Sequence, residues 1–544
     1  MKSSIAASCF LALIVSLNLA GQGPLDPKLL SQPAVDAWPT YHGDYSGRHF
    51  STLKQINKSN VRALSLAWVY RADQGEAGAI MGGEAAGQSP IWLTFIGQQS
   101  IKSIPLMVNG VLYFTMPDHA WAVDARTGQQ IWHYFWRTKG GVHIGNRGFG
   151  MYNNWLFFET PDCYLVSLDA ATGKERWRKQ IADVKQEYFC TPAPVVIREH
   201  VIVGMGGDSL DVPGWLESRD PETGDIQWKW FTTPRRGQPG AESWPDAYAM
   251  EHGGGMPWQP PTYDPELNLL FVPTGNPNPV MAAQSRKGDN LWTASIVALN
   301  PDNGKLAWWF QTSPHDTHDW DAAQVPVLID GTINGQPRKM IAQANRNGFY
   351  FLLDRTNGKN ILTKPFAESM NWYKGIDPKG SPIPNPDKDP KLDGTLVSPT
   401  STGITNWPAP SYSPDTGLFY VGTEQTYSIY YLTDSTLRPQ GYGATERRLM
   451  TAGNHLRALD YKTGEVKWKV PTTSGTQGLL STAGELLFGT DGTGNFIAFD
   501  AENGKPLWHA GIGTTSNAPS TYMLDGKQYV VVGAGDSLYA FYLQ

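Results

Sequence analysis

The sequence predicts an all-β fold, an eight-bladed β-propeller built from tryptophan-docking repeats. The main observation is a recurring pattern of Asp or Asn, three residues, Gly, three residues and Trp. Its six full copies begin at Asp124, Asp169, Asp220, Asn300, Asp460 and Asp500 and end at Trp132, Trp177, Trp228, Trp308, Trp468 and Trp508. The 57 Gly, 40 Pro and 21 Trp among 544 residues also fit many turns and stacked indoles better than helices.

Each copy describes a β-hairpin. Apolar alternation before the acidic residue, as in Trp121–Val123, predicts a strand. The Asp side chain then caps a tight turn, and Gly takes the position with φ > 0. The Trp lies on the returning strand, and because one hairpin cannot bury an indole, a neighbouring sheet must cover it.

Two incomplete copies bring the repeat to eight. The copy that begins at Asp354 has Leu362 in place of Trp, and Asn60–Trp68 supplies a Trp without its turn. The last segment, Ser537–Leu543, is a strand outside any copy. We expect it to pair with the N-terminal segment and close the ring without a free edge. Unrelated hairpins are the alternative, which six copies at one spacing disfavour.

The N-terminus indicates export. Met1–Ala20 has a basic start, an apolar run and small residues at its end, which is typical of a secretory signal. We therefore expect a periplasmic or secreted protein with one propeller domain over residues 21–544. The apolar run is too short for a comfortable membrane span. A net charge of −6 without a Lys/Arg run argues against nucleic acid as a partner.

Two cysteines remain after the expected cleavage, Cys163 and Cys190. A disulfide between them is one expectation in an oxidising compartment, and two free thiols in separate blades are the alternative. The sequence contains no CxxCH motif, so the chain carries no c-type haem of its own.

The spacing between copies is uneven, and long insertions in repeat arrays often carry function. Four motifs make the chain resemble the dehydrogenases that depend on pyrroloquinoline quinone (PQQ), the family of quinoprotein methanol and ethanol dehydrogenases. They are NRG at 146–148, GGGMPW at 253–258, TGNPNP at 274–279 and SPHDTHDWD at 313–321. The likeness also includes Trp38–Gly47 and covers nearly the whole mature chain.

The resemblance implies four residues around the cofactor. Arg147 would pair with a cofactor carboxylate, which suits the planar guanidinium fork. Trp258 would form a flat floor under the quinone, Thr191 would donate to a carboxylate, and Arg346 would reach the quinone oxygens. Considered without the resemblance, Arg147 would be interpreted as a surface residue in a turn, and Trp258 would be interpreted as another indole of the core.

The resemblance also implies a calcium or lanthanide site. Asn276 would supply an amide oxygen, and Asp319 would be the catalytic base beside the metal. The Glu ligand of the family aligns with Ser209, and Asp208 or Asp211, which flank it, are the possible substitutes, although on a strand Asp208 would point to the other face. Asp321 stands where lanthanide-dependent members have an extra Asp. It either replaces the lost Glu for calcium or suits a trivalent ion.

Other positions depart from the family. Lys102 stands where a Glu contacts the cofactor, and Glu424 stands at an Asn position. The adjacent Cys pair of the family aligns with Gly141 and Val142. The substrate is therefore not carried over from the methanol enzymes.

The favoured hypothesis is an exported dehydrogenase for an alcohol, polyol or sugar-like substrate. Hydride would pass to the quinone, the metal would act as a Lewis acid, and Asp319 would accept the proton. Electrons would pass to a soluble cytochrome or another external acceptor. The alternatives are a non-catalytic propeller scaffold for protein partners and a degenerate quinoprotein that has lost its metal.

Overall fold

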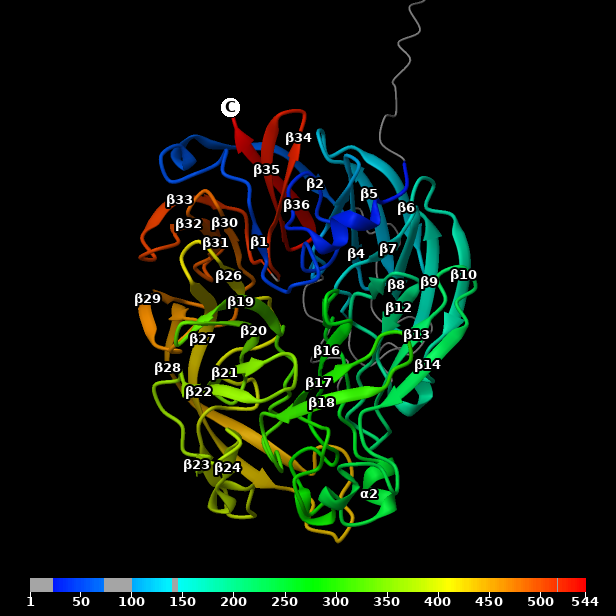
Figure 1. The fold of residues 1–544 in the computed structure, drawn as a ribbon, viewed down its shortest axis with the longest axis vertical. Helices are drawn as coiled ribbons and strands as arrows, with labels where there is room; N and C mark the ends of the chain where they lie inside the picture. The colour runs from blue at the N-terminus through cyan, green and yellow to red at the C-terminus, as the bar shows by residue number, and fades with distance from the viewer. Residues whose placement is uncertain (1–22, 73–99, 139–144, 516) are drawn as a thin grey trace, which may run out of the picture.

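Consecutive antiparallel strands build the molecule, and each sequence repeat contributes to one sheet. The computed structural model describes residues 23–72, 100–138, 145–515 and 517–544. Within these residues there are eight sheets of four or five strands and one two-stranded sheet. Figure 1 shows the larger sheets arranged around a shared centre, as in a β-propeller. The expected signal segment and the Gly141–Val142 position lie outside the described residues.

Five sheets are simple four-stranded meanders. They consist of β3 (Leu106–Val108), β4 (Val111–Met116), β5 (His119–Asp124) and β6 (Gln130–Phe135); β7 (Gly150–Tyr152), β8 (Trp155–Glu159), β9 (Tyr164–Asp169) and β10 (Glu175–Gln180); β11 (Val195–Ile197), β12 (His200–Val203), β13 (Trp215–Arg219) and β14 (Ile226–Phe231); β15 (Thr262–Asp264), β16 (Leu269–Pro273), β17 (Ser295–Leu299) and β18 (Leu306–Gln311); and β19 (Val327–Ile333), β20 (Gln336–Ala344), β21 (Phe349–Asp354) and β22 (Asn360–Pro365).

The other three sheets are less regular, because two of them contain five strands and two of them include a strand from near the start of the chain. They consist of β25 (Thr395–Val397), β26 (Ser411–Ser413), β27 (Leu418–Leu432), β28 (Ala444–Asp460) and β29 (Val466–Thr472); β1 (Phe50–Ser51), β30 (Leu480–Thr482), β31 (Leu486–Thr490), β32 (Asn495–Asp500) and β33 (Pro506–Gly511); and β2 (Leu64–Arg71), β34 (Ser520–Leu524), β35 (Lys527–Ala534) and β36 (Ser537–Leu543). The small sheet pairs β23 (Tyr373–Ile376) with β24 (Pro382–Pro384).

Helical segments are short in the described parts of the chain. They are α2 (Ala247–Glu251) and the 3-10 helices η1 (Pro27–Ser31), η2 (Val61–Ala63), η4 (Val184–Gln186), η5 (Ala241–Ser243), η6 (Ala283–Ser285) and η7 (Pro386–Lys388). No helix in these parts is long and apolar enough to cross a membrane.

The repeat motif forms the turn between the last two strands of a sheet. In the first copy, Asp124 Oδ1 accepts the backbone N–H groups of Arg126 and Thr127, and Gly128 has a φ of 71°. The indole of Trp132 donates to the carbonyl oxygen of Ala170 in the next repeat, at 2.8 Å. A Cβ atom on the glycine of that next repeat would lie 2.6 Å from the Trp132 ring. In this pair of repeats, the Trp of one repeat therefore packs against the turn of the next.

The two ends of the chain share a sheet, as predicted. β36 pairs antiparallel with β2 over the register Leu64–Leu543 to Arg71–Ser537. Figure 1 shows the C-terminal strands beside β2. The pairing brings a strand from near the start of the described chain together with its last strand.

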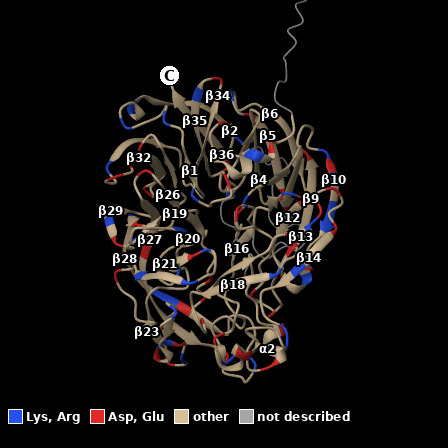
Figure 2. Ribbon diagram, in the orientation of Figure 1, with Lys and Arg blue, Asp and Glu red and all other residues tan. Residues whose placement is uncertain are grey.

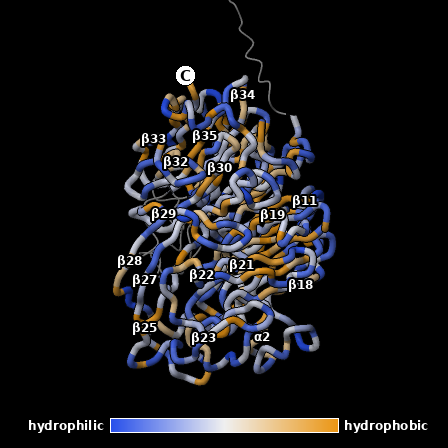
Figure 3. Tube along the Cα trace, turned by 60° about the vertical axis from the view of Figure 1, so that its left-hand side comes forward, coloured by the Kyte–Doolittle hydropathy of each residue, from blue (hydrophilic) through white to orange (hydrophobic). Residues whose placement is uncertain are grey.

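Apolar side chains fill the sheets, and charges occupy the outer strands and loops. Trp38, Trp121 and Trp320 are fully buried. Figure 3 shows apolar residues along the interior strands, and Figure 2 shows charges of both signs on the outer strands. Cys163 and Cys190 are buried neighbours, with their sulfur atoms 2.6 Å apart as two thiols.

Candidate functional site

A cavity of about 340 Å³ lies where the loops that enter the sheets meet. Its walls come mostly from segments before β3, β7, β11, β15 and β19. Equivalent strands run the same way around a propeller, so these loops gather at one end. The lining residues are Lys102, Gly145, Arg147, Phe189, Thr191, Asp208, Trp258, Asp319, Asp321, Arg346, Asn406, Trp407 and Tyr442.

One end of the cavity is cationic. Arg147 donates from Nη1 to Thr191 Oγ1 at 2.7 Å and to the Thr191 carbonyl oxygen at 3.2 Å. Its guanidinium carbon lies 4.9 Å from the ring centre of Trp258 and 4.7 Å from that of Trp407. Burial lowers the pKa of Arg147 to about 10. The pKa of Lys102 is lowered by burial and, to a smaller extent, by the positive charge of Arg147. Two cations therefore stand together in a site that favours an anion.

The opposite end is acidic and is organised around Asp321. Its carboxylate accepts the backbone N–H of Asn276 at 2.6 Å and the indole N–H of Trp258 at 3.1 Å. Arg346 Nη2 lies 3.2 Å from Asp321 Oδ2. Burial raises the pKa of the Asp321 carboxyl, although Arg346 opposes the shift. Asp321 thus links the indole of Trp258 to the loop that carries Asn276 through hydrogen bonds.

Asp319 has an unusual backbone conformation. Its φ of 67° is in the left-handed region, which costs a non-glycine residue about 1 kcal/mol. Its carbonyl oxygen accepts a 2.7 Å hydrogen bond from Arg346 Nη1, and its carboxylate lies 3.8 Å from the same nitrogen. Burial, with Asp321 and Asp208 nearby, raises the pKa of Asp319 well above its usual value despite Arg346. Such strain is typical of functional positions.

Asp208, and not Ser209, faces the cavity. The segment around them is a loop between β12 and β13, so the alternation of a strand does not apply. Burial and the charge of Asp321 raise the pKa of Asp208 to about 7, while a hydrogen bond with the Asn276 side chain lowers it. The condition under which Asp208 would point to the other face, a strand at this position, is therefore not met. Ser209 is not among the lining residues.

Glu424 is also outside the cavity lining. Its carboxylate pairs with Arg448 at 2.9 Å within the β27–β28 hairpin. Asn406 and Trp407 line the cavity instead, and Asn406 Oδ1 accepts from Arg346 Nη2 at 3.4 Å. Sequence reasoning missed both residues, although an Asn-Trp pair in the longest insertion was a usable signal.

The acids do not form a closed ligand cage by themselves. Across the described ranges, no three His, Cys, Asp or Glu side chains gather closely enough to hold a metal ion. Asp208, Asp319 and Asp321 share the cavity with Asn276 behind them, and Arg346 is the cation in contact with two of them. These three carboxyls share one guanidinium, and their pKa values are raised.

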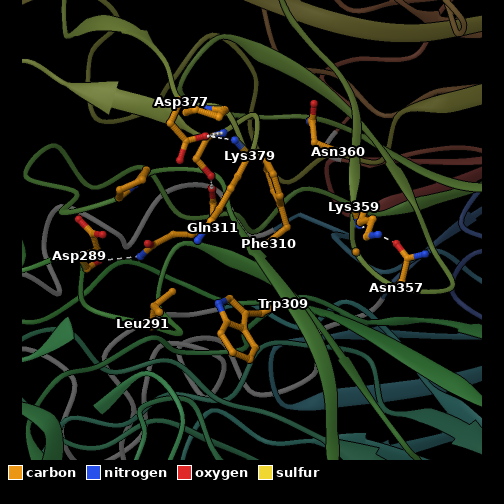
Figure 4. Close-up of a pocket in the computed structure, with 14 residues that line it drawn as sticks. Asp289, Leu291, Trp309, Phe310, Gln311, Asn357, Lys359, Asn360, Asp377 and Lys379 are labelled. Carbon is orange, nitrogen blue, oxygen red and sulfur yellow. Dashed lines mark hydrogen bonds between the residues drawn. The ribbon is translucent and has the colours of Figure 1, made fainter. Parts of the chain in front are cut away.

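A second cavity of about 490 Å³ lies on the outer side, between β18, the turn after β21 and the β23–β24 turn. Figure 4 shows Trp309, Gln311, Asp377 and Lys379 around it, with Gln311 donating to the Asp289 carbonyl oxygen. Its lysines and Asp289 are exposed, whereas Arg147, Arg346 and Asp321 are buried in the first cavity. Buried charge is costly and marks a functional site, so the first cavity is the candidate.

Comparison with known proteins decides the family. A family model described as the beta-propeller domain of glucose, ethanol and alcohol dehydrogenases matches residues 38–368, which include most of the cavity residues. The chain belongs to the PQQ-dependent dehydrogenase family. A second model, described as the outer membrane protein assembly factor BamB, matches residues 444–543.

Individual relatives agree with this assignment. The quinohemoprotein alcohol dehydrogenase ADH IIB of Pseudomonas putida is 34% identical, over 93% of this chain and 74% of its own length. The crystal structure of the quinohemoprotein alcohol dehydrogenase of Comamonas testosteroni has a TM-score of 0.84 and 31% identity, and the match covers 95% of this chain and 82% of that one. A europium-containing methanol dehydrogenase has a TM-score of 0.83 and 27% identity, with 95% and 99% covered.

The cavity fits the cofactor that defines the family. PQQ is flat and carries three carboxylates, and the cavity offers indole faces at Trp258 and Trp407 beside Lys102 and Arg147. The Nε atoms of Arg147 and Arg346 are buried without a hydrogen-bond partner in the described structure. Buried donors of this kind require an acceptor, which an anionic ligand provides.

Proposed function

We propose that this PQQ-dependent oxidoreductase oxidises an alcohol, polyol or sugar-like hydroxyl group and passes the electrons to an external acceptor. The observation that supports the proposal is the polarity of the cavity. Cations and flat indoles stand at one end, and buried carboxyls stand at the other. An anionic redox cofactor and a metal cation match these two ends.

Arg147, Lys102 and Thr191 would hold the cofactor carboxylates. Thr191 already orients the guanidinium of Arg147, so less side-chain entropy is lost when the anion binds. Trp258 would support the ring, and Arg346 would reach the quinone oxygens with its unpartnered Nε group. Asn406 and Trp407 join this set on the basis of their place in the cavity wall.

Asp208, Asp319, Asp321 and Asn276 would supply oxygen ligands to a calcium or lanthanide ion, although the acids do not form a closed cage by themselves. The three carboxyls have raised pKa values, and a bound cation would lower these values and keep the carboxyls ionised. Asp208 would take the place of the carboxylate that Ser209 lacks. The third carboxylate, from Asp321, gives the site enough negative charge for a trivalent ion.

PQQ supplies the two-electron acceptor for hydride, and the cation supplies a Lewis acid. Asp319 would take the proton of the substrate hydroxyl as the hydride leaves the carbon. The hydrogen bond from Arg346 to the Asp319 carbonyl oxygen would hold the base in its left-handed conformation. The loops around the cavity bury these groups, which strengthens each electrostatic contact.

Dye-linked turnover tests the proposal. Purified protein would be incubated with PQQ and either Ca²⁺ or La³⁺ and assayed on primary alcohols, polyols and sugars. We expect dye reduction with at least one substrate class and one ion. The proposal fails if PQQ binds but no substrate is oxidised, which would favour a degenerate quinoprotein. Absence of PQQ binding with either ion would favour a scaffold for protein partners.

We also propose a domain organisation and a location for this enzyme. The eight larger sheets would be eight blades that dock through Trp–turn contacts, and residues 21–544 would form one domain. Residues 1–20 would act as a cleaved signal, which gives a periplasmic or secreted enzyme. A soluble cytochrome or another external acceptor would receive the electrons.

A further inference from the structure

The β27–β28 hairpin extends far beyond its sheet. Its strands have 15 and 17 residues, about three times the mean strand length of 5–6 residues. Figure 1 shows the long yellow-to-orange strands running towards the segment that carries α2. Arg438, near the hairpin tip, lies 4.5 Å from the ring centre of Tyr248 in α2. The tip, residues 433–443, therefore reaches α2, which lies between β14 and β15 in the chain and far from the hairpin's own sheet in sequence.

The tip is anchored on the loops that carry the acidic residues. Val280 N–H donates to the Gly441 carbonyl oxygen at 2.8 Å, and Met281 N–H donates to that of Tyr442 at 3.0 Å. Gly441 N–H donates to Asp211 Oδ1 at 3.0 Å. The anchoring segments follow Asn276 and Asp208 in the chain, so the tip is attached next to the acidic end of the cavity.

Two glycines allow this close approach. Gly441 and Gly443 have φ values of 66° and 61°, in the region that favours glycine. A Cβ on Gly441 would lie 2.8 Å from the Ser209 carbonyl oxygen, and one on Gly443 would lie 2.3 Å from Ala282 Cβ. The residue between them, Tyr442, is therefore held in one place relative to the cavity.

Tyr442 stands at the mouth of the cavity. Its side chain lines the cavity together with Asp208 and Asp319, yet 38% of its surface is exposed. The cavity of about 340 Å³ is at the small end of the range for ligand sites, about 300–1,000 Å³. A tricyclic cofactor would fill most of this volume, so a substrate that reaches Asp319 has to pass the phenol ring.

We infer that Tyr442 determines substrate size and restricts this enzyme to small, unbranched alcohols. The inference rests on the proposed function, because it concerns the substrate of the same site. The ring acts by its volume and fixed position, and the tip loop holds it there through main-chain hydrogen bonds. Steric exclusion at a rigid position discriminates more sharply than the loss of an apolar contact.

Two variants of Tyr442 separate ring volume from the hydroxyl group. The kcat/KM values for 1-propanol and cyclohexylmethanol would be measured with PQQ and the preferred ion. Tyr442→Ala should raise the ratio of cyclohexylmethanol to 1-propanol about tenfold or more. Tyr442→Phe should leave the ratio within about twofold of the wild type, because the ring remains. An unchanged ratio in Tyr442→Ala would overturn the inference.

Further variants test the fixed position of the tip. Gly443→Ala places a methyl group against Ala282, so it should move the tip and raise the same ratio. Leu437→Ala is the matched control, because Leu437 is 90% exposed on the same tip and should leave the ratio unchanged. PQQ binding, followed by absorbance, verifies that each variant is folded and loaded. If the wild-type protein binds PQQ but oxidises no alcohol, the proposed function is overturned. If the enzyme is active and Tyr442→Ala leaves the ratio of the two kcat/KM values unchanged, this inference alone is overturned.

Discussion

Arg346 holds Asp319 by its backbone as well as by its charge. The guanidinium donates a 2.7 Å hydrogen bond to the Asp319 carbonyl oxygen, while the carboxylate lies 3.8 Å from the same Nη1 atom. Because Asp319 has a φ of 67°, this contact stabilises a conformation that the residue does not favour on its own. Asp319 thereby lines the cavity, and its carboxylate is not in close contact with the guanidinium of Arg346.

Asp319→Asn should abolish alcohol turnover, because a neutral amide cannot accept the hydroxyl proton. The expected loss in kcat is about 10²- to 10⁴-fold, the usual contribution of a general base. The amide retains the shape of the side chain, so PQQ binding and thermal stability should remain close to those of the wild type. Steady-state dye reduction checks this prediction. Activity close to that of the wild type would remove Asp319 as the base.

Arg147→Ala should weaken PQQ binding about 10- to 100-fold, because the variant lacks a charged donor in a buried site. Thr191→Val should have a smaller effect in the same direction. It removes only the hydroxyl that accepts from Arg147, and the Thr191 carbonyl oxygen still accepts. Equilibrium titration followed by tryptophan fluorescence measures both. The order of the two effects is the critical result, and a larger effect of Thr191→Val would contradict the assignment.

Asp321→Asn should weaken cation binding, and La³⁺ more than Ca²⁺. The change removes one negative charge, and the affinity of oxygen sites depends on the number of charged ligands. We expect about a tenfold loss for Ca²⁺ and a larger one for La³⁺, measured as the ion concentration that gives half-maximal turnover. Equal losses for the two ions would show that the charge of Asp321 does not select a trivalent ion.

The stability of the protein should respond to pH through His42. Burial lowers the pKa of this residue from 6.5 to about 4, and its Nδ1 atom lies 3.2 Å from His49 Nε2. Between these pH values the unfolded chain binds a proton that the folded protein excludes. The free energy of unfolding therefore falls as pH falls through this window, by about 3 kcal/mol from His42.

A His42→Asn variant isolates this contribution. Urea unfolding would be measured for the wild type and the variant at pH 7 and pH 4. The difference in unfolding free energy between the two proteins should shift by about 3 kcal/mol in favour of the variant at the lower pH. A difference that stays constant with pH would show that His42 does not titrate in this way.

The repeat made most of the fold predictable. Its spacing located the turns at Asp124 and its equivalents, and the unassigned strand Ser537–Leu543 pairs with β2 as expected. Motif positions also located Arg147, Thr191, Trp258, Asp319 and Arg346, all of which line one cavity. These residues were identified through the resemblance of their motifs to the family, and they lie in loops next to strands of the repeat.

The remaining site residues lie in loops and insertions, where the spacing of the repeat does not predict their positions. Asp208 and Ser209 belong to a loop, so the alternation of side chains along a strand does not predict the direction of Asp208. Asn406 and Trp407 belong to the longest insertion, and Tyr442 reaches the cavity from the tip of a long hairpin. Their positions depend on contacts with distant loops, such as that between Met281 and Tyr442, which the sequence does not encode locally.

Titration of the purified wild-type protein with PQQ, with and without Ca²⁺ or La³⁺, tests the central claim most directly. Quenching of tryptophan fluorescence reports binding, because Trp258 and Trp407 line the cavity. We predict saturable binding of one PQQ per chain, strengthened by one of the two ions and weakened at least tenfold in Arg147→Ala. Absence of saturable binding, or binding of equal strength in Arg147→Ala and the wild type, would contradict the claim that this cavity holds the cofactor.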